Sequence, residues 1–179
     1  MEELNEMIKV KSELDGFEID LIKKAANNSV VLKGLIEDFP NDEVLPVRVN
    51  KDALLKIKEY LEHYKDEKPK EIETPLKSSE LKECVDEWDY NFIGKEENIE
   101  VLENLILAAN VLDIKPLLNL LSAKIALKIR GINTPTIRNV FGIKELNDNE
   151  EKVFKADVEY IEKEREKEKS MEKENEKKD

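Results

Sequence analysis

The feature that most constrains the fold is the apolar run at residues 105–115, LILAANVLDIK, with the segment that follows it to Gly131. Apolar residues recur at spacings of three and four through residues 99–112, which predicts a helix with one apolar face. Asp113 then interrupts the run, and Pro116 suits the first turn of a second helix. Because this second helix is apolar on most sides, we expect it to be buried. The helical hairpin is therefore the expected core.

Composition excludes several classes of protein. The chain has 179 residues and a formal net charge of −12, which argues against nucleic-acid binding, since that usually needs a basic face. No apolar run approaches the roughly 18 residues of a membrane span, and no apolar segment marks an N-terminal signal. Cys84 is the single cysteine and cannot form an internal disulfide, which fits a reducing compartment. We therefore expect a soluble protein of the cytoplasm and nucleus that does not bind membranes.

The first third of the chain alternates strand and helix patterns. Residues 7–10 and 17–20 are strand candidates joined by an Asp15-Gly16 turn, which predicts a small hairpin. Residues 21–26 then predict a short helix that ends at two asparagines.

A second helix and a further strand follow. Ser29 is a good N-cap for a helix that ends before Pro40. Residues 45–49 alternate like a strand, and Pro46 favours an edge position. Asn50 can cap the next helix. The expected apolar side of that helix is formed by Leu54, Ile57, Tyr60, Leu61 and Tyr64.

Residues 65–80 predict a flexible linker or long loop, because they hold two prolines, nine charges and few apolar side chains. The loop is followed by the aromatic residues of WDYNF at 88–92, which include the only tryptophan. We expect these aromatics to anchor the loop to the core rather than to form a ligand site.

Further short helices are expected after the central hairpin. Gly131 stops the second hairpin helix, and Thr134-Pro135 restarts a helix as N-cap and first helical residue. Asn147 and Glu150 resemble a capping box for the last helix. The apolar residues of that helix are Val153, Phe154, Val158, Tyr160 and Ile161.

These C-terminal helices are too short to be stable alone in water, so they need either the core hairpin or a partner. A platform that binds a partner helix and a simple completion of the domain's own core are both compatible with the pattern. Residues 162–179 are almost wholly charged, with eight acids and seven bases, and predict either a solvated helix extension or a disordered tail.

The sequence offers little catalytic chemistry. His63 is the only histidine, so a Cys84–His63 nucleophile pair is the single enzymatic hypothesis, and no orienting motif surrounds either residue. Zinc needs about four ligands, which these two residues cannot supply. The five glycines form no phosphate-binding cluster, and the carboxylates are scattered. A binding role without cofactor or metal is therefore favoured.

Several motifs together resemble one family. The segments LILAANVLDIKPLL at 105–118, WDYNF at 88–92 and GINTPTIRNVFGI at 131–143, with an N-terminal IKV…DGFEID pattern, resemble the Skp family of S-phase kinase-associated or suppressor-of-kinetochore adaptor proteins. The resemblance covers about residues 7–161. It implies an α+β fold: a BTB/POZ domain over residues 1–129, with a small sheet, helical hairpins and a flexible loop at about 65–84. F-box-binding helices at 130–161 and the charged tail at 162–179 would follow.

The resemblance also implies a function. Family members are non-catalytic adaptors of SCF-type cullin-RING ubiquitin ligases, and they link F-box substrate receptors to the N-terminal domain of a cullin. Asn110 matches the family's cullin contact, whereas Val111 replaces its tyrosine, which removes a large interface aromatic and puts cullin affinity in question. Pro135 matches a proline that some protist members hydroxylate. The residues carried over to the F-box contact are Leu118, Ile125, Ile129, Ile137, Val140, Phe141, Val158 and Tyr160.

One alternative keeps the F-box and drops the cullin. The Val111 replacement would then mark a cullin-independent structural partner of F-box proteins, for example in a kinetochore-type assembly. Exposed apolar helix faces also predict weak homodimer formation in the free protein.

Overall fold

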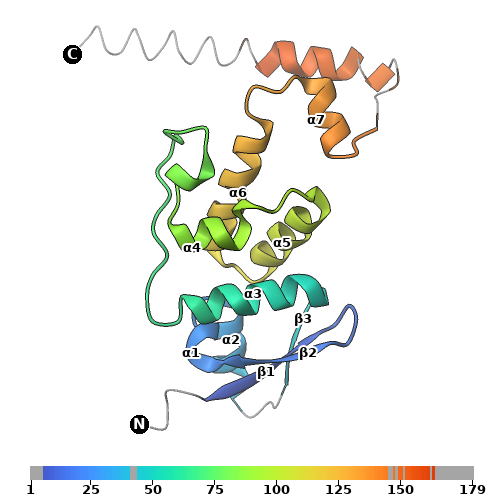
Figure 1. Cartoon of the computed structure of the whole chain (residues 1–179). Helices are drawn as coiled ribbons and strands as arrows, with labels where there is room; N and C mark the ends of the chain where they lie inside the picture. The colour runs from blue at the N-terminus through green and yellow to red at the C-terminus, as the bar shows by residue number, and fades with distance from the viewer. Residues whose placement is uncertain are drawn as a thin grey trace, which may run out of the picture. The chain divides into compact units, whose positions relative to one another are not determined.

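The computed structural model describes residues 6–40, 44–144, 147, 149–150, 152–161 and 163. The chain divides into two compact units, Met1–Ile132 and Asn133–Asp179. Both α-helices and a three-stranded sheet are present, so the fold is α+β, as predicted (Figure 1). The elements of the first unit are β1 (Met7–Ser12), β2 (Glu18–Ile22), α1 (Lys23–Ala26), α2 (Val30–Asp38), β3 (Val44–Val47), α3 (Lys51–His63), a 3₁₀ turn at Leu81–Glu83, α4 (Glu87–Asp89), a π-helical turn at Tyr90–Gly94, α5 (Ile99–Val111) and α6 (Lys115–Ile129).

The sheet has the strand order β2-β1-β3, with β1 antiparallel to β2 and parallel to β3. Val10 pairs with Ile19 on one side and with Leu45 on the other, and all three side chains are buried. Because side chains alternate along a strand, these paired positions share the core face of the sheet. Pro46 lies on β3, which is an edge strand, as its missing N–H predicts.

The predicted hairpin is confirmed, and its turn is built by local hydrogen bonds. The Phe17 N–H donates to Asp15 Oδ1 at 3.1 Å, and Gly16 adopts a φ of 73°, which favours glycine. The prediction of a helix over residues 21–26 is wrong at its start. Leu21 pairs with Ile8 and is buried in the sheet, so α1 begins only at Lys23.

The two predicted caps are confirmed. Ser29 Oγ accepts a hydrogen bond from the N–H of Leu32 at 3.1 Å, and Asn50 Oδ1 accepts one from Ala53 at 2.9 Å. Helix α3 buries the predicted side, and Figure 1 shows it between the sheet and α5, both of which it contacts.

Helices α5 and α6 form the expected hairpin. The interruption at Asp113 has a φ of 47°, a left-handed conformation that aspartate tolerates better than most residues, and Pro116 lies in the first turn of α6. The prediction that α6 is buried on most sides holds only in part, because several of its apolar side chains are half-exposed. These are Leu118, Ile125, Leu127 and Ile129.

Lys124 is buried on α6, contrary to the apolar pattern around it. Its Nζ donates to the Gly94 carbonyl at 2.5 Å and to Glu97 Oε1 at 3.0 Å. Lys128 also pairs with Glu97, and the two ammonium groups lower the pKa of that carboxyl group through these hydrogen bonds. A buried charge is tolerated when it is paired in this way, so this lysine attaches the segment before α5 to α6.

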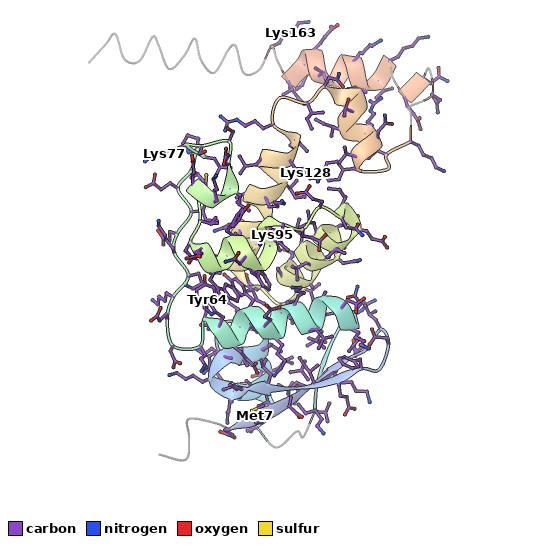
Figure 2. The ribbon with its side chains drawn as sticks, viewed as in Figure 1. Met7, Tyr64, Lys77, Lys95, Lys128 and Lys163 are labelled. Atoms are coloured by element: carbon purple, nitrogen blue, oxygen red, sulfur yellow. The ribbon has the colours of Figure 1, made fainter. Side chains whose placement is uncertain are left out.

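Segment 65–80 contains no helix or strand, and its Ile72 and Leu76 are half-buried against the core. The aromatic residues that follow anchor it, as predicted. The Trp88 ring stacks 3.7 Å from His63 and lies 5.4 Å from Tyr64, which is labelled in Figure 2. These aromatic contacts attach the segment to the C-terminal end of α3.

The second unit holds α7 (Thr134–Val140) and a helix at residues 152–161. The N-cap of α7 is Asn133, whose Oδ1 accepts from Thr136 N–H at 3.0 Å, so the prediction of Thr134 as cap is wrong by one residue. The capping box is confirmed: Asn147 N–H donates to Glu150 Oε2 at 2.9 Å, and Glu150 N–H donates to Asn147 Oδ1 at 3.1 Å. The predicted tail at 162–179 lies outside the described residues, except for Lys163.

Candidate protein-binding surfaces

The end of α5 carries the two residues expected to contact a cullin. Asn110 and Val111 are both exposed in the last turn of the helix. Ser29 Oγ donates to the Leu112 carbonyl at 2.5 Å, and Val30 N–H donates to the Asp113 carbonyl at 3.5 Å. These two bonds hold the first turn of α2 against the end of α5.

The two helices that meet at this junction expose four large aliphatic residues, which we name together the α2–α5 patch. Each of its members is between 37% and 61% exposed. The α2–α5 patch consists of Val30, Val31, Leu107 and Val111. Only Val111 was expected from the sequence to contact a partner, because the contact between Ser29 and Leu112 that joins the two helices is long-range.

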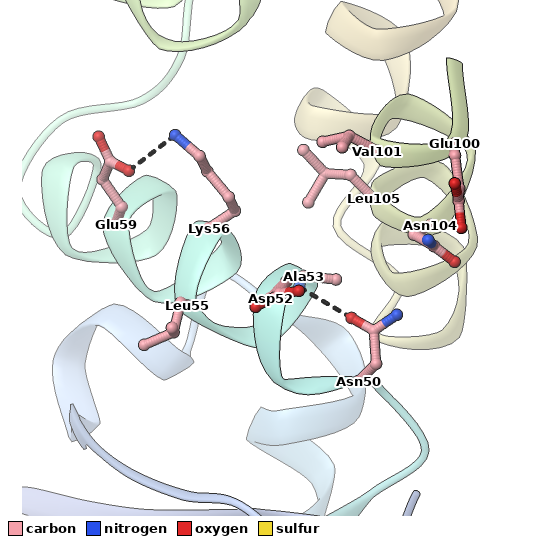
Figure 3. A pocket seen from close by; sticks show the side chains of 10 residues that line it. All are labelled: Asn50, Asp52, Ala53, Leu55, Lys56, Glu59, Glu100, Val101, Asn104 and Leu105. Carbon is pink, nitrogen blue, oxygen red and sulfur yellow. Dashed lines mark hydrogen bonds and ion pairs between the residues drawn. The ribbon is translucent and has the colours of Figure 1, made fainter. Parts of the chain in front are cut away.

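A groove between α3 and α5 lies on the same face of α5 (Figure 3). Its volume is about 550 Å³. Glu100 and Asn104 line it, and helical spacing places both on the stripe that continues to Leu107 and Val111. The ten lining residues include no histidine, cysteine or hydroxyl side chain.

The residues expected to contact an F-box on α6 share one face. Leu118, Ile125 and Ile129 are separated by seven and four positions, and all three are half-exposed. Leu118 and Ile125 also pack against the core of the first unit, so they are held in place by it.

The remaining expected F-box residues belong to the second unit. Ile137, Val140 and Phe141 share one face of α7 and its end, and each is half-buried. Tyr160 is 66% exposed, whereas Val158 is half-buried and lies about 160° from Tyr160 around the helix, at 100° per residue. The structure therefore does not place Val158 and Tyr160 on one face. Pro135 lies in the first turn of α7, and its side chain is outside the described part of the structure.

The helix at 152–161 presents an apolar face to solvent, which we name the C-terminal stripe. Its large apolar residues are between 45% and 66% exposed. The Arg138 guanidinium carbon lies 5.7 Å from the Phe154 ring centroid, which links this helix to α7 inside the second unit. The C-terminal stripe consists of Val153, Phe154, Tyr160 and Ile161.

The enzymatic hypothesis gains no geometric support. His63 stacks on Trp88, while the Cys84 thiol lies 4.0 Å from the Ser78 carbonyl, so each residue is engaged by a different neighbour. Within the described part of the chain, no group of three or more histidine, cysteine or acidic residues could hold a metal ion. None of the described helices is long and apolar enough to cross a bilayer.

A buried acid lies beside the aromatic anchor. Asp89 is 3% exposed, and its Oδ1 has no hydrogen-bond partner among the described residues. Burial, with a smaller contribution from the nearby Asp86 carboxylate, raises the pKa of Asp89 to about 6, although a hydrogen bond with Tyr64 acts in the opposite direction. Asp86 itself accepts from Tyr64 Oη at 3.2 Å and from Asp89 N–H at 2.8 Å. This arrangement affects stability rather than catalysis, because the acid is enclosed in the core.

Comparisons with known proteins agree with the sequence motifs. Residues 115–159 match the family model described as "Skp1 family, dimerisation domain". The S-phase kinase-associated protein 1 homolog of Tetrahymena thermophila is 44% identical over 126 residues, which cover 70% of this chain and 75% of that protein. The E3 ubiquitin ligase complex SCF subunit sconC of Arthroderma benhamiae is 34% identical over 131 residues, which cover 72% of this chain and 79% of that protein. The subunit of the same name from Aspergillus fumigatus is 33% identical over 131 residues, 72% of this chain and 81% of that protein.

Proposed function

Because this chain belongs to the Skp1 family, we propose that it is a non-catalytic adaptor subunit of an SCF ubiquitin ligase, linking F-box substrate receptors to a cullin scaffold. The observation that carries the proposal is the 44% identity to a homolog of S-phase kinase-associated protein 1 over three quarters of that protein. The names of the sconC relatives place those proteins in SCF complexes, so the cullin-independent alternative is not favoured. The proposal includes a BTB/POZ fold for residues 1–129 and localisation to the cytoplasm and nucleus.

For the cullin side, we propose the α2–α5 patch with Asn110 as the contact surface. Val111 lacks the aromatic ring of the family pattern, but Val30, Val31 and Leu107 of the α2–α5 patch add exposed apolar area. Burying such side chains at an interface stabilises a complex by roughly 25 cal/mol per Å² before the costs of association. The patch therefore supports cullin binding without the tyrosine.

Substitutions at the α2–α5 patch test this surface. We expect Val111→Tyr to raise affinity for a cullin N-terminal domain, and Val30→Ser with Leu107→Ser to lower it by about tenfold or more. Leu14→Ser is the matched control, since Leu14 is 58% exposed on the β1–β2 turn, away from the patch. Calorimetric titration should show no change for Leu14→Ser. If the double variant bound the cullin as tightly as the natural chain, the patch would not be the contact.

For the F-box side, we propose the C-terminal stripe together with the half-exposed faces of α6 and α7. Short amphipathic helices with uncovered apolar faces are suited to bind a partner helix. Val153→Ser with Tyr160→Ser should weaken co-purification with an F-box segment, whereas Leu14→Ser should not. Unchanged F-box binding by the double variant would remove the C-terminal stripe from the interface.

Two further points follow from the family. We propose that the free protein forms weak homodimers through these uncovered apolar faces, which light scattering over a concentration series would detect. We also propose Pro135 as a hydroxylation site, which mass spectrometry of the protein from its native source would show as one added oxygen.

A further inference from the structure

A separate cleft lies in the first unit, where segment 65–80 passes the C-terminal end of α3 and the corner between α5 and α6. Residues 68–72, Tyr60 and Tyr64 of the α3 end, and residues 114–116 of the corner line it. Its volume is about 370 Å³, within the range of roughly 300–1,000 Å³ that small-molecule sites occupy. None of the residues assigned to a cullin or an F-box lines it, so a function here would be independent of the proposed adaptor role.

The lining of this cleft is basic, in a protein whose formal net charge is −12. Lys68, Lys70 and Lys115 line it, and Glu71 is its one acidic lining residue. None of these three lysines makes an ion pair or a side-chain hydrogen bond with the described residues. By contrast, the nearby Lys24 and Lys65 lie 2.6 Å and 3.7 Å from the carboxylate oxygens of Asp66. Three lysines without an ion-pair partner among the described residues, around one concave site, favour an anionic ligand.

Tyr60 forms part of the inner wall. Tyr60 lines the cleft and is fully buried, and its hydroxyl has no hydrogen-bond partner among the described residues. Burial raises the pKa of Tyr60, as do the charges of Asp89 and Asp86, so the hydroxyl stays protonated. A buried polar group without a partner is costly and rare in folded proteins.

The rest of the lining is apolar or amide. Ile72 and Ile114 form apolar walls with two prolines, and Asn119 contributes an amide group. Asn28 donates from Nδ2 to the Tyr64 carbonyl at 2.8 Å, which fixes the wall beside α3. Apolar walls with a few convergent polar groups are the usual construction of a small-molecule site.

We propose that this cleft binds a small organic anion, with phosphate or carboxylate groups held by Lys68, Lys70 and Lys115 and an apolar portion against Ile72 and Ile114. The ligand must carry both an anionic group and an apolar portion. The anionic group would pair with the lysines, and the apolar portion would pack against the apolar walls.

The fluorescence of Trp88 can report ligand binding in this cleft. It is the only tryptophan, and its ring centroid lies 6.0 Å from Tyr60 and 5.4 Å from Tyr64, the two aromatic residues that line the cleft. The full chain would be titrated with ATP, pyrophosphate and adenosine, followed by Trp88 fluorescence and by calorimetry. We expect ATP to bind more tightly than pyrophosphate, and adenosine to bind least, because only ATP offers both charge and an apolar ring.

A matched pair of triple variants separates a specific site from diffuse attraction. Replacing Lys68, Lys70 and Lys115 by glutamine should weaken ATP binding by about tenfold or more. Three exposed lysines elsewhere serve as the control, because replacing them by glutamine changes the net charge equally and should leave ATP affinity within about twofold. These control positions are Lys9, Lys95 and Lys144.

Two results would overturn the proposal: no measurable binding of ATP or pyrophosphate to the natural chain, or an equal loss of ATP affinity in both triple variants. Both variants should still co-purify with an F-box segment. That measurement keeps a failure of the cleft distinct from a failure of the adaptor function.

Discussion

Helix α5 and the helix at 152–161 carry similar apolar patterns but differ in burial. Leu102, Leu105 and Ala109 of α5 are buried in the core of the first unit. None of the described residues of the helix at 152–161 is fully buried, and its Phe154 and Tyr160 are exposed. The comparison shows that α5 buries one apolar face in the core of the first unit, whereas the helix at 152–161 leaves its apolar residues open to a partner.

The largest expected effect tests this contrast within α5 itself. Leu105→Ala removes a side chain that is 1% exposed, and we expect it to lower the free energy of unfolding by about 2–5 kcal/mol. Leu107→Ala, two residues along the same helix and 56% exposed, should change it by less than about 0.5 kcal/mol. Urea unfolding followed by Trp88 fluorescence measures both. Equal losses would mean that α5 is not buried on the face assigned to it.

Asp89 is the main electrostatic exception in the well-packed unit. Its pKa in the folded state, about 6, is raised above the ordinary aspartate pKa of 3.8, so its protonated form stabilises the fold. That stability is fully present below about pH 4 and is lost as the pH rises through 6. A pKa shift of this size corresponds to a loss of roughly 2–3 kcal/mol in the free energy of unfolding.

The variant Asp89→Asn should therefore remove this pH dependence. We expect its free energy of unfolding, relative to that of the natural chain, to rise by roughly 2–3 kcal/mol between pH 4 and pH 8. Urea unfolding at both pH values gives the difference. A difference that does not change with pH would show that Asp89 is not the titrating group.

Gly94 tests how tightly the aromatic anchor is packed. A Cβ added at Gly94 would lie 2.5 Å from Cδ2 of the Tyr90 ring, so Gly94→Ala should cost about 1–3 kcal/mol of stability. Gly34 lies within α2 with no atom within 4 Å of an added Cβ, so Gly34→Ala should instead stabilise by up to about 1 kcal/mol. Thermal unfolding of both variants gives the comparison, and a stabilising Gly94→Ala would contradict the packing described here.

The smallest expected effect on stability lies in the C-terminal stripe. Phe154 is 45% exposed and touches Arg138, so Phe154→Ala should change the free energy of unfolding by less than about 0.5 kcal/mol. The same substitution should weaken F-box binding by about tenfold, since aromatic anchors carry much of the energy of an interface. If Phe154→Ala greatly lowered the free energy of unfolding but left F-box binding intact, Phe154 would be a core residue and not part of a binding surface.

Much of the fold follows from local patterns in the sequence. Ser29, Asn50 and the Asn147–Glu150 capping box were predictable because caps depend on residues three positions apart. The α5–α6 hairpin was predictable from its periodicity. The start of α1 was not, because Leu21 is drawn into the sheet by pairing with Ile8, a contact that periodicity does not contain.

The candidate surfaces were less predictable for the same reason. Asn110 and Val111 came from a family resemblance, whereas the start of α2 is held at the end of α5 by Ser29 bonding to Leu112, 83 positions away. The burial of Lys124 likewise depends on Gly94 and Glu97, which lie about 30 positions earlier in the chain. Long-range contacts of this kind decide which apolar residues remain exposed.

The central claim is that the uncovered apolar surfaces of this chain bind an F-box and a cullin. Size-exclusion chromatography with light scattering, on the full chain mixed with an F-box segment and with a cullin N-terminal domain, tests it most directly. We predict a complex with each partner alone and a ternary complex with both. Elution of the chain separately from both partners would contradict the adaptor function.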